Sequence, residues 1–289
     1  MLPYPTGVGE KPEPTRAKPP PRLYRVGYSA DVAAFASWDW LTGTGRWDDP
    51  QIAALHNWIS EREASRFRED REEEEHIRRA FAAEIARIDA PVRPYRVLYT
   101  AGSRKSAYIE TFQRYRSSGA GPLTRWASAM IDSVLEDADD IPPSPPPSTG
   151  PGTGRVGTAD VSPMFIGEID MGASDFANLE TAPSVQYIHD TLQREAKLHG
   201  IPIINRGAIL GNVLPFTQAV SAFIYRCEGA FSGIRHDSTH GTPHECWAVF
   251  ERPTGAPSPA YCETAKSEPV SLGDPDLCEA LDELGIRIV

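Results

Sequence analysis

Prolines divide this chain into segments that can and cannot hold regular structure. Of the 27 prolines in 289 residues, seven lie in residues 1–22 and six in residues 139–151. Proline lacks an amide donor and fixes its own φ angle, so helix interiors and central strands exclude it. We therefore expect a disordered Pro-rich tail at 1–21, and a single folded domain over 22–289 that carries an inserted Pro-rich surface loop at 139–158.

Strand-type and helix-type patterns follow one another outside these clusters. Alternating or short apolar runs rich in β-favouring residues predict strands at 22–28, 95–100, 164–169, 201–204, 231–236, 245–251 and 286–289. Capping residues and helical periodicity predict helices at 103–116, 122–137, 183–199, 215–228 and from 274 onward. The elements show no regular strand–helix–strand order, which favours an α+β fold over a doubly wound parallel sheet.

One segment predicts an unusually long helix, residues 50–89. Its two ends carry apolar residues near the helical period, and Pro50 suits a first helical turn. Its centre, residues 60–79, holds eight acidic residues and six arginines. Mixed charges of this kind are typical of a solvated helix face. We expect this long charged helix to be an appendage that projects, bends back over the surface or docks on a partner.

Charge and composition exclude several classes of protein. Forty acidic against 29 basic residues give a net charge of −11, with no basic cluster to bind nucleic acid or an anionic membrane. No apolar run approaches the length of a membrane-spanning helix, and the first residues do not resemble a secretory signal. The sequence therefore predicts a cytoplasmic protein, with four widely spaced cysteines as reduced thiols.

One cluster invites a metal-site interpretation: His236, His240, His244 and Cys246. Four-residue spacing would align the histidines on a helix face. Gly241 and Pro243 break any helix there, and the following residues predict a strand. We expect no metal.

Four short segments carry residue types suited to catalysis: Gly-Arg-Trp-Asp at 45–48, Leu-Tyr-Thr-Ala at 98–101, Ala-Tyr-Ile-Glu-Thr at 107–111 and Gly-Ile-Arg-His-Asp-Ser at 233–238. Each has an ordinary structural explanation when taken alone. Arg46 would be a surface ion-pair partner and Tyr99 a core residue at a strand end, while Glu110 would face solvent and Ser238 would cap a turn.

In this order the four segments resemble the RES domain family, named for its Arg, Glu and Ser. The family has a Gly-Arg-Trp, a strand that ends in Tyr, a Glu on the next helix, and a Gly-Ile-Arg-Tyr-x-Ser segment before an apolar strand. Tyr99 and Glu110 are eleven residues apart, as the family pattern expects. The resemblance covers about 22–48, 95–116 and 160–251. It implies Arg46, Tyr99, Glu110 and Ser238 as catalytic residues, and Arg25, Arg46, Tyr99 and Arg235 as NAD-binding residues.

The resemblance also implies a fold and a reaction. RES proteins are similar to ADP-ribosyltransferases, with two packed, twisted sheets, peripheral helices and NAD as the substrate in the cleft between the sheets. The family is known as the toxin of bacterial toxin–antitoxin pairs, whose members consume NAD by hydrolysis or phosphorolysis. A carboxylate such as Glu110 stabilises an oxocarbenium-like ribose. A planar Arg46 binds phosphate oxygens, and the Tyr99 ring packs on nicotinamide or ribose.

Three departures from the family pattern stand out. The helix at 50–89 replaces a short connection, the loop at 139–158 is inserted, and His236 stands where the family typically has Tyr. The last change puts local substrate contacts in doubt.

Three functions stay open at this stage. The first is an NAD glycohydrolase or phosphorylase, and the second a protein ADP-ribosyltransferase that would dock its target protein on a surface such as the helix at 50–89. The third is a non-catalytic nucleotide-binding module. The expected partners are NAD, a separate antitoxin chain and a target protein, with no nucleic acid and no membrane.

Overall fold

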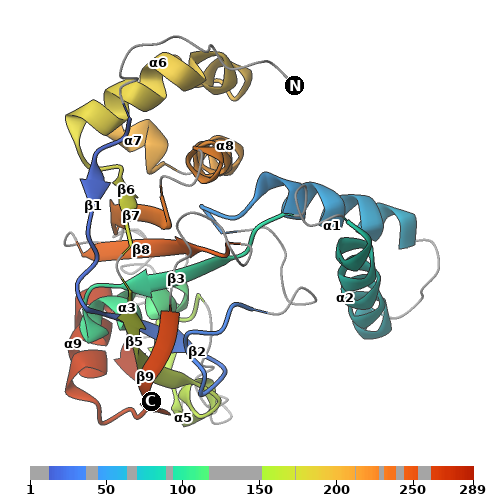
Figure 1. The fold of residues 1–289 in the computed structure, drawn as a ribbon. Coiled ribbons are helices and arrows are strands. Elements are labelled where there is room, and N and C mark those ends of the chain that lie inside the picture. The colour runs from blue at the N-terminus through green and yellow to red at the C-terminus, as the bar shows by residue number, and fades with distance from the viewer. Residues whose placement is uncertain are drawn as a thin grey trace, which may run out of the picture.

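Helices and strands both build the body of the protein (Figure 1), which confirms the predicted α+β class. The computed structural model describes residues 13–36, 45–63, 70–88, 94–116, 152–172, 174–211, 213–227, 231–238, 244–252 and 262–289. None of the helices in these ranges is long and apolar enough to span a membrane. The predicted helix at 122–137 and residues 139–151 of the predicted Pro-rich loop lie outside them. The prediction of a loop is wrong at Arg155–Val156, which form a short strand paired with the strand Arg287–Ile288.

The strands are β1 (Arg16–Ala17), β2 (Arg22–Gly27), β3 (Val97–Ala101), β4 (Arg155–Val156), β5 (Phe165–Met171), β6 (Phe176–Asn178), β7 (Gly233–Asp237), β8 (Glu245–Phe250), β9 (Cys262–Pro269) and β10 (Arg287–Ile288). The helices are α1 (Pro50–Glu63), α2 (Asp70–Arg87), α3 (Arg104–Phe112), the 3-10 turn η4 (Gln113–Tyr115), α5 (Thr158–Val161), α6 (Ala182–Leu198), α7 (Arg206–Ile209), α8 (Leu214–Arg226) and α9 (Pro275–Leu284).

The two predicted sheets occur as two halves of one sheet. Eight strands follow the order β1-β6-β7-β8-β3-β2-β5-β9, and β4 and β10 form a separate pair. Within the sheet β6 and β7 are parallel, and the other neighbours are antiparallel. β3 meets β2 at a single residue pair, Tyr24 with Ala101, whereas β3 pairs with β8 along its whole length. Among the neighbouring strands of this sheet, β2 and β3 therefore share the fewest paired residues.

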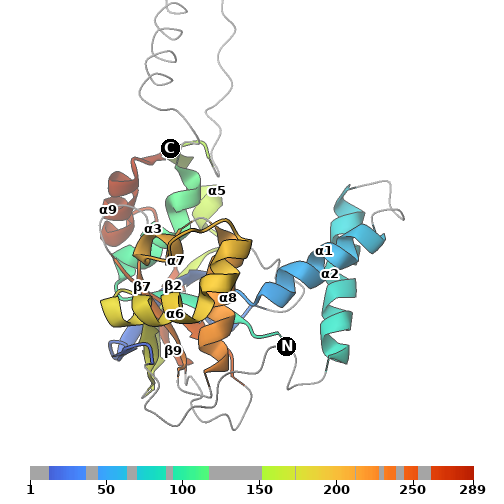
Figure 2. The same cartoon turned by 90° about the horizontal axis from the view of Figure 1, so that it is seen from above.

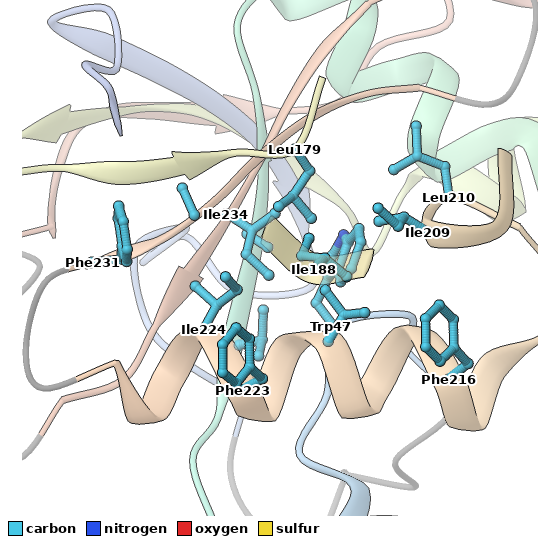
Figure 3. Packing of buried hydrophobic residues seen from close by; sticks show 14 of the residues in the cluster. Trp47, Leu179, Ile188, Ile209, Leu210, Phe216, Phe223, Ile224, Phe231 and Ile234 are labelled. Carbon is cyan, nitrogen blue, oxygen red and sulfur yellow. The ribbon is translucent and has the colours of Figure 1, made fainter. Parts of the chain in front are cut away.

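Each half has its own helical cover and core. On one side, α6, α7 and α8 bury an apolar cluster against β7 and β8; Figure 3 shows α8 side chains packed around Trp47 and Ile234. On the other side, α3 and α9 cover β5 with a second cluster that includes Tyr108, Ile166 and Leu281. A third apolar cluster, with residues from β2, β3, β5, β6 and β8, spans the β2–β3 junction, so the two halves form one body.

The prediction of one continuous helix at 50–89 is wrong. α1 and α2 are separate helices that pack on each other and project from the body (Figures 1 and 2). Their apolar residues form their own cluster, with Ile52 and Ile59 of α1 buried against Phe81 and Ile85 of α2. Pairing two amphipathic helices buries the apolar stripe of each against the other, and α1 also contacts α8 of the body.

The tail predicted at 1–21 also needs correction over its described part. Arg16 and Ala17 pair with Ala177 and Phe176 of β6. The Thr15 amide donates to the Ser184 hydroxyl at 2.9 Å. Residues 13–21 are therefore attached to the sheet, and residues 1–12 lie outside the described residues.

Residues 201–204, predicted as a strand, form a loop. Ile201 and Ile204 are buried in the same core as α6 and α8, while Ile203 is exposed. The apolar run reflects burial of a loop rather than strand pairing.

Candidate functional site

A cavity of about 640 Å³ opens at the β2–β3 junction. Its walls come from β2, β3, α3, β7, β8 and the loop before α1, and its ionisable lining residues include Arg25, Arg46, Tyr99, Glu110, His236 and Cys246. A second hollow of about 530 Å³ shares Arg25 and Glu110 with it. Residues far apart in the sequence therefore meet around Glu110.

The loop before α1 presents Arg46 through a tight set of hydrogen bonds. The Asp48 carboxylate accepts from the Gly45 amide at 2.7 Å and from the Tyr99 hydroxyl at 2.9 Å. The Tyr99 hydroxyl in turn accepts from the Trp47 amide at 3.0 Å. A Cβ atom on residue 45 would collide with the Tyr99 hydroxyl and the Asp48 carboxylate, so only glycine fits there.

Two side chains of helix α8 donate hydrogen bonds to the backbone of the same loop. The Gln218 side chain donates to the Gly45 carbonyl at 3.0 Å, and the Ser221 hydroxyl donates to the Trp47 carbonyl. Trp47 is fully buried in the α8 core. Our sequence reasoning missed Gln218 and Ser221 as supports of the site, although polar residues three apart on an otherwise apolar helix face are a usable signal.

Arg46 lies in the cavity wall with its Nη1 donating to the Leu210 carbonyl. Burial lowers the pKa of Arg46, and the nearby Glu110 carboxylate opposes that shift. The guanidinium thus remains a cation close to Glu110, in a wall where a negatively charged ligand would be attracted.

Tyr99 offers its ring rather than its hydroxyl to the cavity. The side chain is 38% exposed, while its hydroxyl lies between Asp48 and the Trp47 amide. Burial, with the Asp48 charge second, holds the pKa of Tyr99 well above its usual value. The residue is therefore a neutral aromatic surface, not a proton donor at neutral pH.

Glu110 lies on α3, which begins where the sequence predicts. Ser103 caps this helix, accepting from the Ser106 amide. The Ser238 hydroxyl, just after β7, donates to Glu110 Oε1. Ser238 is 8% exposed and is not among the described residues that line the cavity, so it orients the carboxylate from behind.

His236 and Cys246 face each other across β7 and β8 and both line the cavity. Burial lowers the pKa of His236 to about 4, which keeps its imidazole neutral at neutral pH. Burial and the Glu110 charge raise the pKa of Cys246, so this residue stays a thiol. No group of three His, Cys, Asp or Glu residues suited to a metal occurs in the described chain, and His240 lies outside it.

The structure separates the two secondary arginine candidates. Arg25 lines both hollows, and its Nη1 donates to the carbonyls of Val32 and Ala34 at 2.9 and 3.1 Å. Arg235 is not among the described lining residues; its guanidinium pairs with Asp237 at 2.8 Å and Glu245 at 3.0 Å. Because side chains alternate along a strand, Arg235 lies on the opposite face of β7 from His236.

Comparisons with known proteins assign no family. The chain matches no protein-family model and no curated protein. Among solved structures, the M. tuberculosis MbcT–MbcA toxin–antitoxin complex aligns with 93% of this chain and 90% of that chain, at 11% identity and a TM-score of 0.43. A likeness this weak carries no argument, and the case for a function rests on the cavity residues.

Proposed function

We propose that this protein is an NAD-consuming enzyme of the RES type, with an ADP-ribosyltransferase-like arrangement, that cleaves the nicotinamide–ribose bond. The observation that carries the proposal is the meeting of Arg46, Tyr99 and Glu110 in one cavity, with Ser238 bonded to Glu110. Arg46, Tyr99 and Glu110 are separated by up to 64 positions in the sequence, yet they line one volume of the size that small-molecule sites have.

The chemistry needs a carboxylate and no acid. When the C–N bond breaks, its electron pair stays on the nicotinamide nitrogen, which leaves as a neutral molecule. The ribose is then oxocarbenium-like, and a fixed carboxylate beside it stabilises the developing positive charge. The hydrogen bond from the Ser238 hydroxyl, which orients the Glu110 carboxylate, supports this role for Glu110. The attacking water or phosphate forms the new bond to the ribose carbon, and water releases a proton.

The other residues serve binding. NAD carries a pyrophosphate, and the cations Arg46 and Arg25 supply local positive charge in a protein whose net charge is −11. The exposed ring of Tyr99 packs on nicotinamide or ribose and restricts its orientation. This proposal gives Arg235 no part in NAD binding.

A second candidate is transfer of ADP-ribose to a protein. The projecting α1–α2 hairpin favours it, because a helical pair outside the body offers a surface on which a target protein could dock. A toxin role with a separate antitoxin partner, as the RES resemblance implies, is compatible with either reaction. A non-catalytic nucleotide-binding module would need the cavity but not Glu110.

Incubation of the purified protein with NAD labelled in its adenine separates these candidates. Free nicotinamide with ADP-ribose indicates hydrolysis, and ADP-ribose 1-phosphate formed only with added phosphate indicates phosphorolysis. Label on protein in a cell extract indicates transfer. The proposal fails if the protein binds NAD but releases no nicotinamide under any of these conditions.

A further inference from the structure

His236 occupies a position in the cavity that the proposed mechanism leaves without a role. It lines the wall together with Trp47, and the two rings lie 5.3 Å apart between centroids at a tilt of 58°. Its side chain is packed on one side and reaches the cavity on another, at 8% exposure. This packing restricts rotation of the ring in the cavity wall.

The hydrogen bonding of His236 defines which ring nitrogen carries the proton. Nδ1 lies 3.1 Å from the backbone carbonyl oxygen of Asp237. A carbonyl oxygen only accepts, so the proton sits on Nδ1 and Nε2 carries a lone pair. Burial lowers the pKa of the ring to about 4, and the Arg46 charge acts in the same direction. The imidazole is thus neutral and presents a hydrogen-bond acceptor at Nε2.

A ligand group that contacts Nε2 of His236 must therefore be a hydrogen-bond donor. A tyrosine hydroxyl, which the resemblance leads us to expect here, both donates and accepts. Neutral His236 in this tautomer cannot donate from Nε2. A ligand that offers only an acceptor would leave two lone pairs facing each other in a buried wall, which is unfavourable.

The position of His236 relative to Glu110 identifies the part of the ligand. Cys246 pairs with His236 across β7 and β8, and the Cys246 thiol contacts Glu110. Under the proposed function Glu110 faces the ribose carbon that bears the nicotinamide. The group attached there, next to His236, is the nicotinamide ring with its carboxamide.

We propose that His236 determines ligand specificity, its Nε2 accepting a hydrogen bond from the carboxamide N–H of the nicotinamide. This inference rests on the proposed function. It makes the protein selective for the amide over analogues of the same shape that lack the N–H group.

The test compares NAD with its 3-acetylpyridine analogue, in which a methyl replaces the amide nitrogen. Wild type should favour NAD in kcat/KM by roughly 5- to 100-fold, the effect of leaving a buried acceptor without a donor. In His236→Phe the preference should fall to near one. His189→Phe, at a partly exposed position on α6, is the matched control and should keep the wild-type preference.

His236→Tyr keeps the test valid if His236→Phe does not fold, as judged by thermal melting. Its hydroxyl can donate to the ketone, so the preference should also fall. An unchanged preference in a folded variant would overturn the inference. So would wild-type turnover of both compounds at equal efficiency.

A binding measurement separates this inference from the proposed function. Calorimetry with free nicotinamide and free 3-acetylpyridine needs no turnover. If wild type releases no nicotinamide from NAD, the proposed function fails, while tighter binding of nicotinamide that is lost in His236→Phe still supports the role of His236. Equal affinities for the two compounds, or no binding of either, would contradict it.

Discussion

The hydroxyl of Tyr99 bonds to Asp48 and the Trp47 amide, which leaves the ring as the part that faces the cavity. The same network fixes the backbone that carries Arg46. Burial raises the pKa of Asp48, and its bonds from Gly45 and Tyr99 act against that shift. The hydrogen bond between Gly45 and Asp48 therefore belongs to a partly buried network that positions the backbone of Arg46.

Glu110→Gln should abolish most of the NAD turnover and keep the fold. The amide retains the size of the side chain but cannot stabilise a developing cation, and the loss of one such group typically costs about 10²- to 10³-fold in rate. Nicotinamide release measures the effect, with thermal melting as the check on folding. Glu279→Gln, at an exposed position on α9, is the control. Near wild-type turnover in Glu110→Gln would remove Glu110 from the mechanism.

Arg46→Lys should weaken NAD binding although it conserves the charge. A lysine ammonium is a point charge and cannot replace the planar fork that holds two phosphate oxygens. Calorimetry should show a loss of affinity of about tenfold or more, equivalent to about 1.4 kcal/mol. Arg235→Lys should bind NAD like wild type, because Arg235 lies on the other face of β7. Equal effects of the two substitutions would argue against this assignment.

Acid should destabilise the fold through His236. Burial lowers its pKa from 6.5 to about 4, so the unfolded chain binds the proton first as the pH falls. The stabilisation is complete above about pH 6.5 and is lost as the pH falls to about 4, on the order of 3 kcal/mol. Denaturant unfolding between pH 7 and pH 4.5 should show a smaller decline for His236→Phe than for His189→Phe. Parallel declines would contradict the buried neutral imidazole.

The α1–α2 hairpin carries its own apolar cluster and contacts the body chiefly through α8. Trp58 of α1 is 49% exposed. Two helices that bury their apolar stripes against each other do not need contacts with the body to stabilise the interface between them. Arg46, which precedes the hairpin, donates to the Leu210 carbonyl, and Tyr99, which follows it, donates to Asp48.

Replacing residues 54–86 with a flexible linker should therefore preserve NAD turnover within about threefold. Nicotinamide release and thermal melting of the variant are the measurements. If the hairpin docks a target protein, the same variant should lose modification of that protein while still releasing nicotinamide. The substitution Phe81→Asp, which breaks the seam at a fully buried position, serves as a second probe. Loss of folding in the linker variant would show that the hairpin is part of the body.

Local signals predicted most of the regular elements of the chain. Ser103 and Asp274 both act as helix caps where the sequence places them, since their side chains accept from amides of the first turn. The short strands β1, β4 and β6 were missed because two or three residues show no periodicity, and distant pairing alone defines them. The longer strand β9 was missed because its sequence is mostly polar, and its pairing with β5 defines it. The break between α1 and α2 was missed because residues 64–69 contain neither proline nor glycine.

The candidate site was predicted in its residue types, and its geometry depends on tertiary structure. Side chains alternate along a strand, so the sequence alone could have predicted that Arg235 and His236 lie on opposite faces of β7 and that only one of them lines the cavity. The support from Gln218 to the Gly45 carbonyl spans 173 positions and follows only from packing α8 under the loop. The placement of the cavity follows from the β2–β3 junction, where a single residue pair joins the halves of the sheet.

At the scale of the whole molecule, we propose that NAD binds at the β2–β3 junction with its nicotinamide–ribose bond beside Glu110. The structure of the Glu110→Gln variant with NAD bound tests it most directly, because slow turnover keeps the substrate intact. We predict the ribose within hydrogen-bond distance of residue 110, the pyrophosphate at Arg46 and the pyridine ring between Tyr99 and His236. NAD bound elsewhere, or in the cavity with its glycosidic bond remote from residue 110, would contradict this binding mode.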